Sequence, residues 1–410
     1  MKAVVFTLGC KVNEVESASI MATLESMGFE VFDSLCPADI YIINTCAVTK
    51  EAEKKSRQAV TRVRKFNPHA DIYICGCASE KDACAFTRRG VTFVCGTRNK
   101  ENLISAIAAA YSKSNLSLLF PKQTKTRAFV KIEDGCDNFC AYCIIPYLRG
   151  REKSRSIDDI TGEIAKITSP EVVLNGINIS AYNDNGRTLK DLISALHGAA
   201  NRIRLGSLEC SVITEDFLTA LEGLKDFAPQ FHLSLQSGSS AVLKAMNRHY
   251  TREEYLEKCG LIYKHFPEAA ITTDIIAGFP TETEEDFEKS LSIIKEAGFA
   301  RVHAFAFSPR EGTVAYKMKD VPQDVKADRM HRLLQEANSA SLRYITGCIG
   351  KNYEFVAEEK SGEYYTGYTG NYIKVYVKGD LCAGKKYTVK INEPYLDGAL
   401  AEPVHVNQSR

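Results

Sequence analysis

Three cysteines, Cys136, Cys140 and Cys143, follow one another in the pattern C-x3-C-x2-C. Thiolates at this spacing can converge from a single loop on one soft metal centre. A cubane iron–sulfur cluster has four irons, so three cysteines leave one iron open to another ligand. Zinc is the alternative, but a structural zinc site needs a fourth cysteine or histidine, and none follows Cys143 before His197. The pattern therefore favours an iron–sulfur cluster with one open iron.

Three more cysteines, Cys10, Cys46 and Cys77, each stand at or just beyond the end of a predicted strand. In a parallel sheet the carboxyl ends of the strands lie at one edge, so these three thiols can meet in space. A single buried cysteine is more often a small apolar side chain, and a second metal site has about equal weight on the residues alone. Cys75 precedes Cys77 by two residues, and we expect it to point into the sheet.

The composition is that of an ordinary globular protein, with 45% hydrophobic and 25% charged residues in 410 and a formal net charge of +1. So small a net charge gives no global signature of nucleic-acid binding. The 14 cysteines do not indicate a disulfide framework, because the chain is long and starts with a strand and not with a secretory signal. No window approaches about 18 uninterrupted apolar residues, so no membrane span is predicted. We expect a cytoplasmic protein whose thiols stay reduced.

The elements that must position these residues form three predicted domains of an α/β protein. In residues 1–112 strands alternate with helices, which predicts a parallel sheet covered on both faces. Residues 113–127 are polar and are expected to be a linker. Residues 128–345 hold six further strand–helix units, too few for a closed eight-stranded barrel, so an open partial barrel is predicted. Residues 346–410 contain short strands separated by Gly and Asn, as in a small β-barrel.

Several polar residues lie at predicted strand ends of the partial barrel, where loops converge. Gly176, Gln236, Arg248 and Asp274 are candidates to contact a ligand there, although ordinary turn chemistry explains each one equally well. Two basic stretches, residues 54–65 and 149–155, can contact phosphates or simply face solvent. The tyrosines of the last domain can stack on bases, and they are also common strand residues.

With these features in place, the chain resembles the radical S-adenosylmethionine (SAM) methylthiotransferases over nearly its whole length. The resemblance rests on the order of the domains: three cysteines in the first, C-x3-C-x2-C in the second, and a carboxyl-terminal TRAM domain of OB-like form. Residues 8–13 (LGCKVN) and 367–376 (GYTGNYIKVY) look like the subgroup that acts on threonylcarbamoyladenosine 37 of tRNA. Two other subgroups act on isopentenyladenosine in tRNA and on an aspartate of a ribosomal protein. A zinc-containing RNA-binding protein without enzymatic activity is the alternative outside the family.

The resemblance implies two 4Fe-4S clusters and SAM as cofactors. It assigns the first cluster, whose open iron binds SAM, to Cys136, Cys140 and Cys143, and the second, which carries the sulfur, to Cys10, Cys46 and Cys77. The residues it places near SAM are Tyr142, Gly176, Gln236, Arg248 and Asp274. A radical derived from SAM would take hydrogen from adenine C2, where the methylthio group is then delivered. The implied partners are the anticodon arm of tRNA, an electron donor protein and a sulfur source.

Overall fold

The computed structural model describes residues 1–114, 117–120 and 126–404. The predicted linker, 113–127, therefore falls partly outside the described residues. The chain divides into two compact units, and neither of them is continuous in sequence. Unit 1 consists of Met1–Lys122, Asp134–Glu152 and Ser308–Tyr316, and unit 2 consists of Gln123–Glu133, Lys153–Phe307 and Lys317–Arg410. All six candidate cluster cysteines belong to unit 1.

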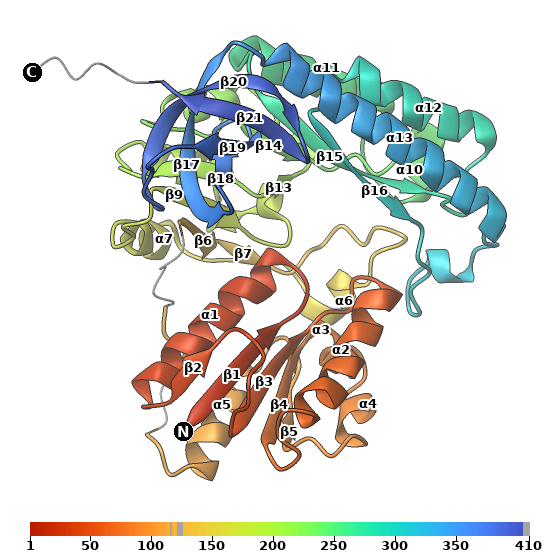
Figure 1. The fold of residues 1–410 in the computed structure, drawn as a ribbon. Helices are drawn as coiled ribbons and strands as arrows, with labels where there is room; N and C mark the ends of the chain where they lie inside the picture. The colour runs from red at the N-terminus through yellow and green to blue at the C-terminus, as the bar shows by residue number, and fades with distance from the viewer. Residues whose placement is uncertain (115–116, 121–125, 405–410) are drawn as a thin grey trace, which may run out of the picture. The chain divides into compact units, whose positions relative to one another are not determined.

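Unit 1 is built on a five-stranded parallel sheet of order β2-β1-β3-β4-β5 (Figure 1). Its strands are β1 (Lys2–Thr7), β2 (Glu30–Phe32), β3 (Ile40–Thr45), β4 (Asp71–Gly76) and β5 (Phe93–Val94). Its helices are α1 (Lys11–Ser26), α2 (Lys50–Arg64), α3 (Cys77–Lys81), α4 (Cys84–Thr87), α5 (Lys100–Ala110) and α6 (Ile145–Arg149). The two-residue strand β7 (Glu133–Asp134) lies at its boundary.

Both faces of this sheet are covered, as the fully buried strand β3 requires. Helices α1 and α5 pack on one face through Leu24 and Leu103. Helix α2 packs on the other face through Val60, together with α6, which contributes Leu148. Because α6 directly follows Cys143, the loop that carries the C-x3-C-x2-C pattern is anchored in the core of unit 1.

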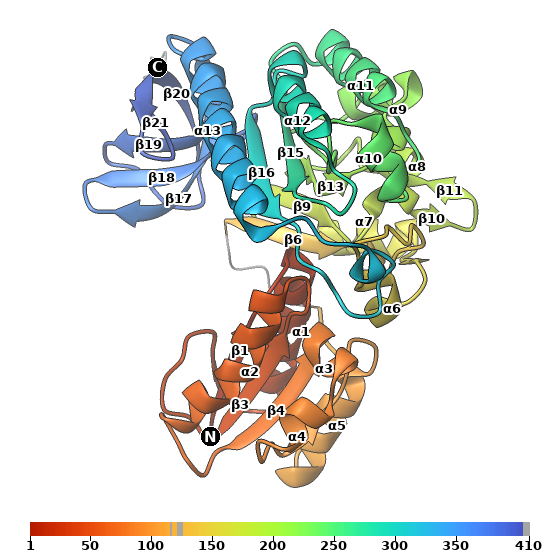
Figure 2. The ribbon, with the colours of Figure 1, turned by 90° about the vertical axis from the view of Figure 1, so that its right-hand side faces the viewer.

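Unit 2 contains the predicted open partial barrel, formed by two parallel sheets of order β12-β9-β6 and β13-β14-β15-β16 (Figure 2). The strands are β6 (Arg127–Lys131), β9 (Glu171–Asn175), β12 (Arg202–Leu205), β13 (Ser207–Leu208), β14 (Gln230–Leu233), β15 (Ala270–Ala277) and β16 (Arg301–Ala306). The helices are α7 (Ile157–Ile164), α8 (Leu189–Ala195), α9 (Glu215–Glu222), α10 (Ser240–Ala245), α11 (Arg252–His265), α12 (Glu284–Glu296) and α13 (Gln323–Gly347). Three short strands complete it: β8 (Lys153–Ser154), β10 (Asn183–Asp184) and β11 (Arg187–Thr188).

A closed five-stranded barrel follows α13, and this confirms the predicted carboxyl-terminal domain. Its strands are β17 (Asn352–Ser361), β18 (Tyr364–Thr369), β19 (Lys374–Lys378), β20 (Lys386–Tyr395) and β21 (Gly398–Pro403). Within unit 2 this barrel is tied to the partial barrel by charge: Arg204 of β12 donates to the carbonyl oxygens of Thr369 and Gly370, and Arg127 of β6 pairs with Glu358 at 2.8 Å. The predicted fold class, an α/β protein with these three parts, is confirmed.

Candidate metal centre and ligand site

Cys10, Cys46 and Cys77 lie on the loops that follow three neighbouring strands of unit 1, β1, β3 and β4. Cys10 caps α1, and Cys77 is the first residue of α3. The loops are tightly packed: a Cβ atom on Gly9, whose φ is +107°, would lie 2.8 Å from the Sγ of Cys46. The parallel sheet thus brings these loops together at its carboxyl edge, as the sequence predicts.

Cys10, Cys46 and Cys77 are close enough that neighbouring thiols contribute to the pKa values of Cys46 and Cys77. Burial raises the pKa of Cys77 to about 11, Arg149 opposes the rise, and the neighbouring Cys10 and Cys46 add to it. Burial also raises the pKa of Cys46, with a further contribution from Cys10, while Arg149 and Arg310 lower it. Three converging thiols beside two cations are a suitable donor set for a metal–sulfur group, because such a group binds as thiolates.

Arg149 and Arg310 are buried beside these thiols, with side chains only 1% and 2% exposed. Arg149 bonds to Glu16 at 3.0 Å and Arg310 to Glu53 at 2.6 Å. In both arginines the Nε atom is buried and has no hydrogen-bond partner among the residues that the structure describes. A sulfur-rich anionic cluster would supply the missing acceptor, so the chain's own residues fit the implied group.

Cys75 lies apart from this group, on the opposite face of the sheet. Its side chain is fully buried in the hydrophobic cluster that contains Leu103 and Ile107 of α5. Burial strongly raises the pKa of Cys75, Lys100 opposes the rise, and Cys95 adds to it. Alternation along one strand would place residues 75 and 77 on the same face, so it is the turn at Gly76, whose φ is +103°, that separates Cys77, the first residue of α3, from Cys75.

The second triad lies on the loop between β7 and α6 of unit 1. Its entry is fixed by Gly135, whose φ is +90° and where a Cβ would lie 2.2 Å from the carbonyl oxygen of Arg151. The Cys136 amide donates to the Gly150 carbonyl at 3.1 Å, and the Cys143 amide donates to the Cys140 carbonyl at 2.9 Å. Cys140 is buried, whereas Cys136, Cys143 and the intervening Tyr142 are half-buried. Backbone hydrogen bonds thus hold this loop.

The four remaining candidates belong to unit 2. Gly176 follows β9, and a Cβ there would lie 2.6 Å from Glu133 Oε2, so only glycine fits. The backbone N–H of Gln236, whose φ is +74°, donates a hydrogen bond to the backbone carbonyl of Asp274 at 2.8 Å. The guanidinium of Arg248 binds Glu209 at 2.7 Å and the Ser234 carbonyl at 3.3 Å. Gln236 and Arg248 therefore lie at the carboxyl end of β14, whereas Asp274 lies in the middle of β15.

One arginine of the basic stretches and two tyrosines of the barrel make contacts within the protein and do not face solvent alone. Arg149 does not face solvent, because Glu16 and Asp134 enclose its guanidinium. Tyr368 and Tyr372 stack at 4.6 Å between their ring centroids, and Arg127 and Arg204 lie over their faces. These two tyrosines hold the barrel to the rest of unit 2.

Two histidines that the sequence analysis did not single out stand near Asp274. His232 Nε2 lies 3.3 Å from Asp274 Oδ2, and the rings of His232 and His303 are 5.7 Å apart. The available signal was their position at alternate residues of apolar strands, where each replaces an expected apolar side chain.

Two family models match parts of this chain. Residues 2–96 match the model of Uncharacterized protein family UPF0004, and residues 130–294 match that of the Radical SAM superfamily. None of the helices among the described residues is long and apolar enough to cross a membrane.

Relatives of known name align along almost the whole chain. The chain is 38% identical over 408 residues to the threonylcarbamoyladenosine tRNA methylthiotransferase MtaB of Chlamydia pneumoniae, covering 97% of both proteins. It is 35% identical to the MtaB protein of Bacillus subtilis (strain 168), covering 97% of this chain and 96% of that protein. It is also 37% identical to the tRNA-2-methylthio-N(6)-dimethylallyladenosine synthase of Fervidobacterium nodosum, covering 96% of each.

Solved structures share the fold at low identity. The radical SAM methyltransferase TsrM of Kitasatospora setae has a TM-score of 0.54 at 12% identity, over 74% of this chain and 72% of that chain. The cobalamin-dependent radical SAM enzyme OxsB has a TM-score of 0.54 at 11% identity, over 82% of this chain and 56% of that chain. Both support the α/β fold alone. The full-length identities to named relatives decide the family: the chain belongs to the radical SAM methylthiotransferases, and it is of the MtaB type.

Proposed function

We propose that the protein transfers a methylthio group to C2 of N6-threonylcarbamoyladenosine 37 in tRNA, with SAM and two 4Fe-4S clusters as cofactors. The observation that carries the proposal is the convergence of Cys10, Cys46 and Cys77 beside two buried arginines, in addition to the C-x3-C-x2-C loop. Two separate sets of three thiols suit two clusters, each with one open iron. The names of the MtaB relatives support the substrate.

The residues of this chain have distinct proposed roles. Cys136, Cys140 and Cys143 hold one cluster, and Cys10, Cys46 and Cys77 hold the other. When bound, these groups and SAM supply the one-electron and sulfur-transfer chemistry that an unreactive adenine C2–H bond requires. Arg149 and Arg310 offset the negative charge of the thiolates in a buried setting, where unpaired charge is costly.

The proposed SAM contacts are Tyr142, Gly176, Gln236, Arg248 and Asp274. The position of Gln236 and Arg248 at the carboxyl end of β14 supports their part of this assignment, since ligands of parallel α/β sheets bind at that edge. Gly176 contributes by its lack of a side chain, which leaves room for Glu133 and Ile179 against the loop after β9.

The proposed partners are the anticodon arm of a tRNA, an electron donor protein and a sulfur source. On the carboxyl-terminal barrel, Tyr364, Tyr376 and Tyr395 form an aromatic cluster, and Lys374 and Lys378 each lie 5.1 Å from one of its rings. Aromatic faces beside cations are typical of surfaces that bind single-stranded RNA.

Mass spectrometry of tRNA nucleosides tests the function. A strain that lacks the gene should accumulate threonylcarbamoyladenosine, and the wild-type protein should restore its 2-methylthio form. Cys46→Ala should fail to restore it, whereas Cys84→Ala, a change at an exposed cysteine, should succeed. The substrate assignment is wrong if the methylthio group returns on isopentenyladenosine, as the relative from Fervidobacterium nodosum makes the natural second candidate.

Iron content tests the cofactors independently of activity. Anaerobically purified protein should carry about eight irons per chain. Changing Cys10, Cys46 and Cys77 together to alanine should remove about half of them. Zinc in place of iron would exclude the proposed chemistry.

A further inference from the structure

One face of the sheet formed by β14, β15 and β16 is unusually polar. Along these strands Phe231, Leu233, Ile271, Ile275 and Val302 point into the hydrophobic core, to which α11, α12 and α13 also contribute. The alternate positions therefore face the inner side of the partial barrel, which those helices do not cover. The residues at these positions are Gln230, His232, Thr272, Asp274, Arg301 and His303.

Strand register brings four of these side chains into one strip. His232 pairs across the sheet with Thr272, and Asp274 pairs with His303. Thr272 Oγ1 lies 3.0 Å from His232 Nδ1, and Asp274 Oδ2 lies 3.3 Å from His232 Nε2. Because both ring nitrogens have fixed partners, the imidazole of His232 is held in one orientation.

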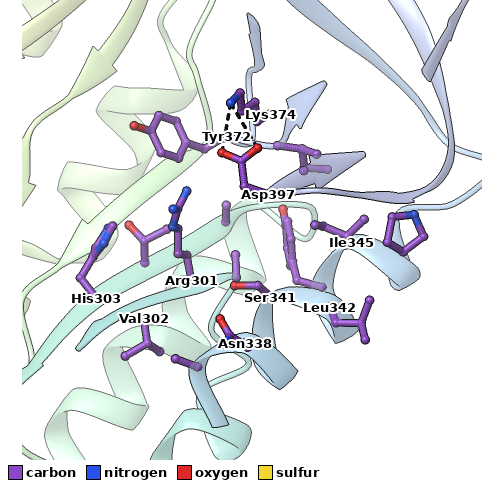
Figure 3. A pocket seen from close by; sticks show the side chains of 18 of the residues that line it. Arg301, Val302, His303, Asn338, Ser341, Leu342, Ile345, Tyr372, Lys374 and Asp397 are labelled. Atoms are coloured by element: carbon purple, nitrogen blue, oxygen red, sulfur yellow. Dashed lines mark hydrogen bonds and ion pairs between the residues drawn. The ribbon is translucent and has the colours of Figure 1, made fainter. Parts of the chain in front are cut away.

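Arg301 adds a cation to this strip. Arg301 pairs with Thr272 in the strand register. It precedes His303 by two residues, so both side chains lie on the same face of β16 (Figure 3). Within the part of the chain that the structure describes, its guanidinium has neither an ion pair nor a hydrogen bond. Lys374, nearby in the same cavity, is by contrast bound to Asp397 at 3.0 Å.

A cavity of about 670 Å³ opens beside these side chains, within unit 2. Thr272, Arg301 and His303 line it on the strand side, Asn338 and Ser341 line it from α13, and Tyr372 lines it from the carboxyl-terminal barrel. His232 and Asp274 do not line the cavity and act on it through His303 and Thr272. Sites for small molecules commonly have a few hundred Å³ of space and a few convergent polar groups. The cavity is therefore large enough for a nucleoside substituent together with water.

We infer that Arg301 and His303, with His232 held by Asp274, recognise a carboxylate-bearing, hydrogen-bonding substituent on the N6 atom of the substrate adenine. The inference rests on the proposed function and gives the chemical basis of its substrate choice. Half-buried polar groups are costly unless a ligand satisfies them, and a guanidinium fork matches a carboxylate in geometry and charge. An aliphatic substituent would leave the Arg301 guanidinium without an anionic partner, so the cavity selects against it.

The competing occupant is a divalent cation. One ligand atom from each of His232, Asp274 and His303 lies within 4.8 Å of the others, which a transition metal could use. Arg301 argues against this assignment, because a guanidinium beside the same strip repels a cation and attracts an anion.

Binding of anticodon stem-loop RNAs to the full-length holoenzyme tests the inference. The RNAs differ only at N6 of the target adenine, which carries the threonylcarbamoyl group, its methyl ester or an isopentenyl group. By fluorescence anisotropy, the wild-type protein should bind the acid about tenfold more tightly than the ester, because a charge-assisted contact is lost. Arg301→Gln should bind acid and ester alike, and Arg301→Lys should keep part of the preference.

The matched control is Arg343→Gln, which removes an exposed arginine paired with Glu336 and should retain the full preference. Equal binding of acid and ester by the wild-type protein would overturn the inference without any variant. Saturable Mn²⁺ binding, detected by electron paramagnetic resonance and lost in Asp274→Asn, would also overturn it. If cells methylthiolate threonylcarbamoyladenosine while acid and ester bind alike, only this inference fails; if they do not, the proposed function fails.

Discussion

Replacing Arg149 by methionine should destabilise unit 1 strongly. The guanidinium is almost fully buried, and it contacts Glu16 at 3.0 Å, Asp134 at 2.9 Å and Asn13 at 2.7 Å. Removing one partner of a buried ion pair costs about 3–5 kcal/mol, because the other charge is left without compensation. Glu16 keeps Lys100 at 2.8 Å, so we expect the lower limit, about 3 kcal/mol.

The shared carboxylate makes the effect of two substitutions larger than their sum. Lys100→Met alone leaves Glu16 with Arg149, just as Arg149→Met alone leaves it with Lys100. The double variant leaves Glu16 buried with neither cation. Its loss of stability should exceed the sum of the single losses by about 1 kcal/mol or more.

Hydrogen–deuterium exchange of the α1 peptide, which contains Glu16, is a suitable assay because the chain has no tryptophan for fluorescence. The control is Arg151→Met in the same loop: its side chain is 71% exposed and pairs with Asp137, so exchange should barely change. The reasoning would be refuted if Arg149→Met and Arg151→Met had equal effects. Strictly additive losses in the double variant would refute the shared-carboxylate argument.

Three further outcomes concern the thiols at the carboxyl edge of the sheet. Because burial raises the pKa of Cys46, and of Cys77 to about 11, both bind metal only after losing a proton. Between pH 7 and 8 the Zn²⁺ affinity of apoprotein lacking the other triad should rise about a hundredfold, measured by chelator competition; a flat profile would contradict this. Cys77→Ala should lower iron content by up to half, and Cys75→Ala should leave it unchanged. Equal losses would show that the assignment of Cys77 as a cluster ligand and Cys75 as a core residue is wrong. Gly76→Ala should lower the thermal unfolding midpoint seen by circular dichroism, because φ is +103° and a Cβ would lie 2.4 Å from the Thr45 carbonyl oxygen; an unchanged midpoint would mean that the loop relaxes freely.

Local patterns in the sequence were sufficient for the elements and their order. Apolar runs such as β3 and the Gly or Pro turns after them predict parallel strands, because burial on both faces demands continuous apolar side chains. The spacing of Cys136, Cys140 and Cys143 likewise predicts a common loop. These features depend on neighbours in sequence, so they could be read without the structure.

Other features depend on contacts between distant residues, which local patterns do not encode. Arg310 bonds to Glu53 across 257 positions, and nothing around either residue predicts that pair. The sequence leaves Arg149 either as a phosphate contact or as part of a solvated loop, but its side chain is buried beside the apolar contacts of Leu148 in α6. Single polar residues such as His303 acquire meaning only when the strand register aligns them with His232.

The discontinuity of unit 1 has a consequence for synthesis. Its sheet and helices emerge first from the ribosome, but the segments Asp134–Glu152 and Ser308–Tyr316 also belong to it. Until residue 310 has been made, Glu53 lacks its buried arginine, and until residue 148 has been made, one face of the sheet lacks α6. Domains generally fold as units during translation, the amino-terminal one first. Here the first sheet to be made must wait for three-quarters of the chain before its last segment, which carries Arg310, can complete it.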